Sequence, residues 1–240
     1  MKAEGKNPVR ELINSELTIE KISVADGCND NEVRKLVQMA RDKGIKVEFV
    51  DKRGLDKVSE TGHHQGIIGF YSEFKYANLD EVIKKTRESG KDILFVILDE
   101  VLDPHNLGSV IRVAECAGAT AVIIPSRRSA TVNETVIRTS AGATAYVPVI
   151  KVQNTNQAIE ELKKQNIWVY AADMDGSPMG KTNLKGDIAL VIGGEGSGVH
   201  QLTRKVCDGI ISIPMFGKVN SLNASVSAGI VLYEAVRQRM

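Results

Sequence analysis

The stretch IISIPMFGKVNSLNASVSAGIVLYE, residues 210–234, decides the fold. Its first residues, Ile210-Ile211-Ser212-Ile213, form an apolar run that predicts a buried strand, which a proline and a glycine then end. Small polar residues follow at 220–225, and an apolar helix is expected over 226–236. Because backbone N–H groups and side-chain amides face a ligand in such a strand–loop–helix arrangement, the stretch predicts a ligand site.

A helix cap is the simpler interpretation of residues 220–225, since Asn and Ser cap helices routinely. One cap needs one such residue, whereas Asn220, Ser221, Asn223 and Ser225 supply four in six positions. This surplus favours a ligand site over a cap alone.

The composition indicates a soluble globular protein. The chain has 240 residues, of which 42% are hydrophobic and 25% charged, which is enough apolar material for a sizeable core. Apolar runs stay well short of the roughly 20 residues that span a bilayer, and the polar start, residues 1–16, lacks a signal-peptide core. We therefore expect a cytoplasmic protein without a membrane partner.

Charge and cysteine content exclude few functions. Cys28, Cys116 and Cys207 are odd in number and far apart, so we expect neither a metal site nor a disulfide framework. The net charge of +1 and the 5% aromatic content do not by themselves indicate a nucleic-acid binder. A local basic patch would nevertheless be enough for one.

Residues 1–75 predict a small α/β domain. Helical patterns start at Asn7-Pro8 and cover 29–42, and strand patterns lie around 19–24, 47–50 and 66–71. Of the two histidines before the last strand, we expect His63 in a solvated loop and His64 as a candidate substrate contact. The charged segment 76–90 is expected to be a linker with a surface helix.

Residues 91–240 predict a second, larger α/β domain with a mainly parallel sheet and helices on both faces. Continuous apolar runs are typical of parallel strands covered on both faces. They occupy 93–98, 121–124, 145–150, 167–171, 188–192 and 209–213. Helical patterns separate most of them, at 107–117, 133–141, 156–165, 198–206 and 222–239, and this alternation predicts the sheet type.

Two more strand exits carry unusual residues, and ligands bind outside the carboxyl ends of strands in such sheets. After the first strand, Asn106 is a plausible helix cap, and Arg112 follows it by six residues in an otherwise apolar segment. Arg112 is either a snorkelling surface residue or a guanidinium held near a polyanion. After the fifth strand, glycines surround Glu195 over 193–198, in a spacing that matches neither a dinucleotide fingerprint nor a P-loop. A simple turn is the alternative there.

Taken in order, the three stretches resemble the SpoU, or TrmH, family of RNA ribose 2′-O-methyltransferases within the SPOUT superfamily. The family motifs are an Asn followed by an Arg, a glycine-rich turn with a Glu, and I-P-M-x-G-x-x-S-L-N-x-S, which here begins at Ile213. Residues 5–9 and 64–66 also resemble the small L30e/L7Ae-like RNA-binding domain of the RlmB-like ribosomal-RNA branch.

The resemblance implies a fold feature, a cofactor and partners. It implies a C-terminal trefoil knot whose loops bind S-adenosylmethionine, and a homodimer that completes the active site, with no metal. Gly193, Gly194, Ile213 and Leu222 would hold the cofactor. Ribosomal RNA, methylated at a guanosine of the large subunit, is the expected substrate; the alternatives are transfer RNA and a non-catalytic RNA-binding role.

The implied reaction is attack of a ribose 2′-hydroxyl on the sulfonium methyl group. Since a guanidinium stays charged in nearly every protein setting, we expect Arg112 to grip the adjacent phosphate and stabilise the alkoxide rather than act as a simple base. Asn106, Ser221 and Asn223 would orient the reactants, and Glu195 would hold a positive group. Two interpretations remain for Arg127, Arg128 and Arg138: they contact further phosphates, or they belong to an ordinary solvated face.

Overall fold

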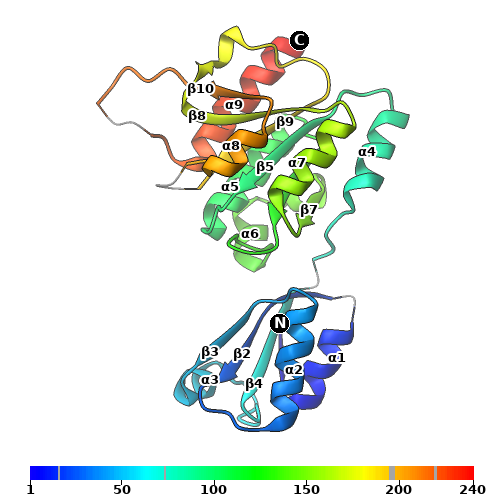
Figure 1. Ribbon diagram of the computed structural model, residues 1–240, viewed down its shortest axis with the longest axis vertical. Helices are drawn as coiled ribbons and strands as arrows, with labels where there is room; N and C mark the ends of the chain where they lie inside the picture. Colours follow the sequence, from blue (N-terminus) through cyan, green and yellow to red (C-terminus); the bar gives the residue numbers. More distant parts are fainter. Residues whose placement is uncertain (16, 73, 195–197, 219–220) are drawn as a thin grey trace. The chain divides into compact units, whose positions relative to one another are not determined.

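The computed structural model describes residues 1–15, 17–72, 74–194, 198–218 and 221–240. It divides into two compact units, Met1–Lys75 and Tyr76–Met240, each with its own sheet (Figure 1). Within these described residues, no helix has the length and apolar character to cross a membrane.

The first unit is a four-stranded mixed sheet with two helices packed on one face. Its elements are β1 (Lys2–Glu4), α1 (Lys6–Asn14), β2 (Thr18–Ala25), α2 (Asn31–Asp42), β3 (Val47–Val50), α3 (Lys52–Val58) and β4 (Ile67–Ser72). The strand order is β1-β4-β2-β3, with β4 antiparallel to both its neighbours. The amphipathic faces of α1 and α2 bury Val9, Ile13 and Leu36 against Ile22 and Val24 of the sheet.

Glu4 ties β1 to the loop that precedes β4. Its carboxylate accepts hydrogen bonds from the Ser59 hydroxyl at 2.8 Å, from the Glu60 N–H at 2.6 Å, and from both the N–H and the hydroxyl of Thr61. The hydrogen bond from the Thr61 hydroxyl contributes most, and together these bonds lower the pKa of Glu4 from 4.5 to about 2.

The second unit is built on one six-stranded sheet. Its strands are β5 (Leu94–Asp99), β6 (Ala121–Pro125), β7 (Val149–Val152), β8 (Trp168–Pro178), β9 (Ile188–Gly193) and β10 (Gly209–Ser212). Its helices are α4 (Leu79–Glu88), α5 (Pro104–Cys116), α6 (Glu134–Thr139), α7 (Thr155–Lys164), α8 (Gln201–Val206) and α9 (Ala224–Arg239), with short 3₁₀ turns at Ala143–Ala145 and Met179–Lys181.

Every pairing in this sheet is parallel, and the strand order is β10-β8-β9-β5-β6-β7. All six residues of β5 are buried, as expected for a central strand covered on both faces. One face packs on α4 and α7, through Ile83, Ile159 and Leu162. On the other face α9 packs against β9 and α5. The predicted α/β class is confirmed, and all strand carboxyl ends lie at one edge of the sheet.

Some elements differ from the sequence-based expectations. Segment 76–90 is not a free linker: the Ala77 N–H donates to the Val149 carbonyl, and Ile83 on α4 is buried in the core of the second unit. β8 runs on to Pro178 through polar residues, because its second half pairs with β10 after a register shift at Ile210/Ile211. The short elements β1 and α3 were not expected, since each is too brief to show a period.

Other elements start later than expected. The strand expected from residue 145 begins at Val149, after the 3₁₀ turn and Pro148, which lacks an N–H. Helices α8 and α9 begin at Gln201 and Ala224, because the residues just before them belong to loops at the edge of the sheet.

Replacing Glu4 by Gln is expected to destabilise the first unit in a pH-dependent way. The pKa of Glu4 is lowered in the folded state, so its contribution is complete above pH 4.5 and is lost as the pH falls toward about 2. At pH 7 the loss in opening free energy should be on the order of 1 kcal/mol, allowing for solvent screening. Amide hydrogen exchange in β1 and β4, corrected for intrinsic rates, measures it.

Glu11→Gln, on the exposed face of α1, is the matched control and should show no such pH dependence. If Glu4→Gln lowered the opening free energy by the same amount at pH 7 and at pH 3, the charged Glu4 carboxylate would not be the stabilising group.

Candidate active site

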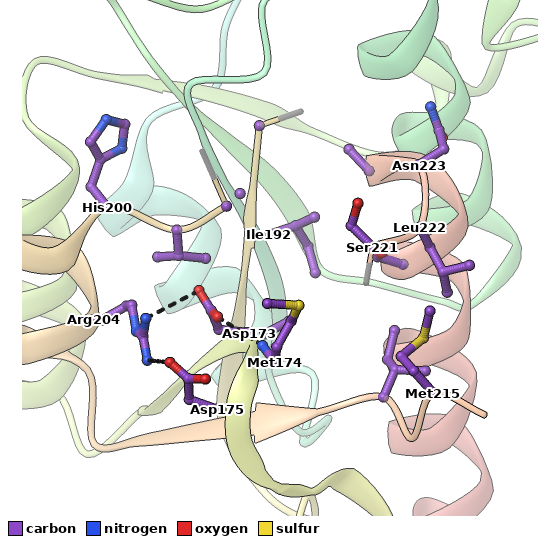
Figure 2. A pocket seen from close by; sticks show the side chains of 18 of the residues that line it. Asp173, Met174, Asp175, Ile192, His200, Arg204, Met215, Ser221, Leu222 and Asn223 are labelled. Atoms are coloured by element: carbon purple, nitrogen blue, oxygen red, sulfur yellow. Dashed lines mark hydrogen bonds and ion pairs between the residues drawn. The ribbon is translucent and has the colours of Figure 1, made fainter. Parts of the chain in front are cut away.

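A cavity of about 870 Å³ lies at the carboxyl ends of β8, β9 and β10. β6 and β7 lie on one side of β5 and the later strands on the other, so the sheet has a switch point between β5 and β9, beside the cavity. Such a switch point leaves the space outside the strand ends uncovered, which is where α/β sheets bind ligands. Figure 2 shows Ser221, Leu222 and Asn223 on one side of the cavity and His200 and Arg204 on the other.

One wall includes the described glycines at the two ends of the glycine-rich segment 193–198. A side chain on Gly193 would place its Cβ 2.1 Å from the carbonyl carbon of Gly198, and one on Gly194 would lie 2.4 Å from the carbonyl oxygen of Glu100. The glycines are therefore required because two backbone segments pack directly against each other. This packing shapes the wall that Gly193, Gly194 and Gly198 present to the cavity.

The opposite wall comes from the chain between β10 and α9, where Ile213, Ser221 and Leu222 line the cavity. Asn223 is the N-cap of α9: its side-chain oxygen accepts from the Ser225 N–H at 2.9 Å. Its amide also donates to the side-chain oxygen of Asn106 at 2.9 Å. Asn223 thus both caps α9 and lines the cavity.

The sequence suggested Asn106 as the cap of α5, but Asn106 does not cap this helix. Asp103 is the cap, accepting from the His105 N–H at 3.0 Å, and Asn106 lies within the first turn. Asn106 is 7% exposed and faces Asn223, so the first and third motifs meet through side chains 117 residues apart.

Sequence reasoning missed the charged groups at the cavity. The Arg204 guanidinium donates to Asp175 at 3.1 Å and pairs with Asp173 at 3.6 Å (Figure 2). His200 lies between Asp99 and Glu100, at 3.2 Å from an oxygen of each. Two adjacent carboxylates at the end of β5, Asp99 and Glu100, were the available signal, but nothing local connected them with a histidine about a hundred residues later.

The expected site residues separate into two groups. Six of them line the cavity: Gly193, Gly194, Ile213, Ser221, Leu222 and Asn223. Glu195 lies outside the described residues. Arg112 is exposed on α5 and is not among the described residues that line the cavity. Arg127, Arg128 and Arg138 are exposed, and Arg128 donates to Glu100 at 3.2 Å.

His64 is buried in the first unit, at 5% exposure. One ring nitrogen lies 2.9 Å from an Asp56 oxygen, and the other accepts from the Gly66 N–H at 3.1 Å. These bonds hold the turn before β4, so the structure gives His64 a positioning task, and His63 beside it is exposed.

The lining combines apolar side chains with a guanidinium, an imidazole, two carboxylates, two amides and two hydroxyls. Such a surface fits an organic ligand with an apolar body and charged groups of both signs. Among the described residues, no cluster of three or more His, Cys, Asp or Glu could hold a metal ion.

Comparison with known proteins gives the class and then the family. The model described as "RNA 2'-O ribose methyltransferase substrate binding" matches residues 2–77, which span the first unit. A second model, the SpoU rRNA Methylase family, matches residues 93–233, and the chain belongs to this family. The resemblance drawn from the three motifs is thereby confirmed.

Relatives that match nearly the whole chain carry names of the same kind. The 23S rRNA (guanosine-2'-O-)-methyltransferase RlmB of Xanthomonas campestris is 39% identical over 98% of this chain and 96% of its own. YacO of Bacillus subtilis, provisionally named as a TrmH family tRNA/rRNA methyltransferase, is 39% identical over 98% of this chain and 94% of its own. The SpoU methyltransferase AviRb of Streptomyces viridochromogenes, solved with AdoMet, shares the fold at a TM-score of 0.63 and 23% identity, covering 99% of this chain and 90% of its own.

Gly193→Ala is expected to damage the cavity, because the new Cβ meets backbone atoms that have no room to move. Overpacking of this kind costs about 2 kcal/mol of unfolding free energy and displaces the cavity wall, so ligand affinity should fall as well. Thermal unfolding and calorimetric titration with S-adenosylmethionine measure the two effects.

Gly180→Ala is the control, since its Cβ would lie 4.0 Å from the nearest atom. If Gly193→Ala and Gly180→Ala behaved alike, the close backbone contact would not be the reason for glycine at position 193.

Proposed function

We propose that this RNA ribose 2′-O-methyltransferase takes its methyl group from S-adenosylmethionine bound in the cavity, and transfers it to a guanosine of large-subunit ribosomal RNA. The observation that carries the proposal is the meeting of the three family motifs at one sheet edge. Two of them line the cavity, and the Asn106–Asn223 hydrogen bond connects the remaining one.

The cavity suits this cofactor. Ile192, Ile213 and Leu222 supply an apolar region for an adenine ring, and the backbone of the glycine turn can approach it closely. Asp173, Asp175 and Arg204 provide charges of both signs for the amino and carboxyl groups of a methionine portion. S-adenosylmethionine supplies the electrophilic methyl group, while the protein positions the reactants.

Ser221 and Asn223 on the cavity wall, with Asn106 behind them, are proposed to orient the ribose and the methionine portion. Glu195, which lies outside the described residues, is proposed to hold a positive group. Arg112 is proposed to bind the adjacent phosphate and stabilise the developing alkoxide. We further propose phosphate contacts for Arg127, Arg128 and Arg138, whose exposure leaves them accessible to RNA.

A homodimer accounts best for the position of Arg112. This residue is exposed on α5 and does not line the described cavity of its own chain, so a second copy would bring it to a neighbouring site. The trefoil knot that the family resemblance implies remains a prediction as well. Monomeric sedimentation at micromolar concentration would count against the dimer.

Ribosomal RNA is favoured by the first unit, which matches the substrate-binding model, and by the name of the Xanthomonas relative. A transfer-RNA substrate is the second candidate. A solved Aquifex aeolicus TrmH/SpoU tRNA modifying enzyme is 29% identical and covers only 67% of this chain, with a TM-score of 0.56.

Deleting the gene should remove one 2′-O-methylated guanosine from 23S ribosomal RNA, which mapping of ribose methylation in total RNA would detect. Restoring the intact gene should bring the mark back, and a Ser221→Ala copy should restore it incompletely. Loss of a transfer-RNA mark instead would select the second substrate. No altered mark, together with no calorimetric binding of S-adenosylmethionine, would identify a non-catalytic RNA-binding member.

Arg112→Lys is expected to lower kcat about a hundredfold, because an ammonium group cannot make the bidentate contacts of a guanidinium to phosphate. The affinity for S-adenosylmethionine should stay unchanged, since Arg112 does not line the described cavity. Single-turnover methyl transfer with saturating RNA measures the rate.

Arg237→Lys, at an exposed position on α9 where the side chain pairs with Glu234, is the control substitution. Retention of most activity by Arg112→Lys would argue against bidentate recognition by Arg112.

A further inference from the structure

Asp173 lies in an irregular part of β8 that borders the cavity. β8 pairs with β9 only as far as Ala172, and the register shift on β10 leaves residues 173–176 between the two ladders. A Cβ on Gly176 would lie 2.5 Å from the carbonyl carbon of Ile211, so the end of this segment packs directly against β10. The segment is thus held at its end, and it brings two carboxylates into the cavity lining.

The two carboxylates are compensated to different degrees. The Asp175 side chain is 73% exposed and accepts a hydrogen bond from the Arg204 guanidinium at 3.1 Å. The Asp173 side chain is only 14% exposed, and the same guanidinium lies 3.6 Å from its Oδ2. Oδ1 accepts from the Met174 N–H at 2.7 Å, whereas Oδ2 accepts no hydrogen bond from the described residues. Asp173 is therefore the less solvated and less compensated of the two charges.

The charges of the described lining do not cancel. Asp173 and its neighbouring carboxylate face one guanidinium, which leaves one negative charge in excess. His200 also lines the cavity, but it lies beside Asp99 and Glu100, and Glu100 pairs with Arg128 as well. Protonated or neutral, His200 gives this second group no excess of positive charge. The described lining as a whole thus favours a cationic ligand.

Methyl transfer changes the charge of the cofactor. The bond between the methyl carbon and sulfur breaks, its electron pair stays on sulfur, and the ribose oxygen gains the methyl group as its hydroxyl proton is released. The sulfonium thereby becomes a neutral thioether, so S-adenosylhomocysteine has one positive charge fewer than S-adenosylmethionine. A nearby carboxylate distinguishes the two more strongly in a partly desolvated cavity than in water, because the effective dielectric constant there is lower.

We propose that Asp173 is a specificity-determining residue, whose charge makes the cavity prefer the cationic methyl donor over its neutral product. The inference rests on the proposed function, because it takes S-adenosylmethionine to be the ligand of this cavity. It goes further by assigning to Asp173 the discrimination against the spent cofactor. Arg204, which lies beside the carboxylate, limits this preference by offsetting part of the negative charge.

Calorimetric titration of the full-length protein with S-adenosylmethionine and with S-adenosylhomocysteine tests the proposal, since specificity is the ratio of two affinities. Asp173→Asn keeps the shape of the side chain and an oxygen for the Met174 N–H, but removes the charge. Affinity for S-adenosylmethionine should fall about tenfold, while affinity for S-adenosylhomocysteine should change less than about twofold. An equal fall for both ligands, or none for either, would overturn the proposal.

Arg204→Gln should shift the ratio in the opposite direction. Removal of the compensating guanidinium leaves Asp173 more strongly negative in effect, so the preference for the methyl donor should rise about threefold or more. Arg204→Lys keeps the charge and should restore the original ratio. A disordered cavity wall would weaken both ligands together, and it would not move the ratio in opposite directions. A fall of the ratio in Arg204→Gln would contradict the role of charge.

An analogue separates charge from the size of the methyl group. Sinefungin carries a protonated amine on a carbon that replaces the sulfonium centre, so Asp173→Asn should weaken it about as much as S-adenosylmethionine. If Asp173→Asn left sinefungin unaffected, charge would not be the property that Asp173 recognises. Asp80→Asn, at an exposed position in the first turn of α4, is the matched control and should leave all three affinities unchanged.

The outcomes distinguish this inference from the proposed function. If the unchanged protein binds neither S-adenosylmethionine nor its product, both are overturned. If it binds them, but Asp173→Asn leaves the ratio of their affinities unchanged, only the discrimination by Asp173 fails. Should Asp173→Asn not fold, the pair Arg204→Gln and Arg204→Lys still decides, since the same ratio in both variants would overturn the inference.

Discussion

The parallel pairing of the second sheet is the constraint on which the rest of the structure depends. Every strand of β10-β8-β9-β5-β6-β7 runs the same way, so the loops after β5, β8, β9 and β10 meet at one edge. Backbone segments there approach so closely that Gly193 and Gly194 leave no room for a Cβ. The cavity is the space outside the carboxyl ends of β8, β9 and β10, and its walls are fixed by the core beneath them.

Helix α9 connects this edge with the opposite one. At its start, Asn223 caps the helix and binds Asn106. At its end, the Arg239 guanidinium donates to the backbone carbonyls of Leu184, Ile93 and Gly186, and burial lowers its pKa. A helix held at both ends connects the core to the cavity wall, because it buries Val231, Leu232 and Ala235 while Ser227 near its start lines the cavity.

Much of this could be predicted from sequence. Runs such as Ile93–Leu98 fixed the parallel sheet, since only a strand covered on both faces is apolar throughout. Motif residues such as Ile213 and Leu222 were expected at one site because they follow a strand, and both line the cavity. The Asp99–His200 and Asn106–Asn223 contacts, 101 and 117 residues apart, could not be foreseen. Polar contacts between residues so far apart leave no periodic pattern in the sequence. The polar second half of β8 was missed for the same reason, because its pairing with β10 is also distant in the chain.

The surplus of small polar residues before α9 now has a physical explanation. The Asn223 side-chain oxygen already accepts from the Ser225 N–H, the Ser225 hydroxyl and the Val226 N–H, while its amide donates to Asn106. Turning that oxygen toward a ribose would uncap the helix and leave buried Asn106 without this donor, which costs about 1–3 kcal/mol. In the proposed reaction, such a cost favours Ser221 for direct contact with the ribose. Asn223 would then contribute to the proposed orientation of the reactants as the helix cap next to Ser221, through its hydrogen bond to Asn106.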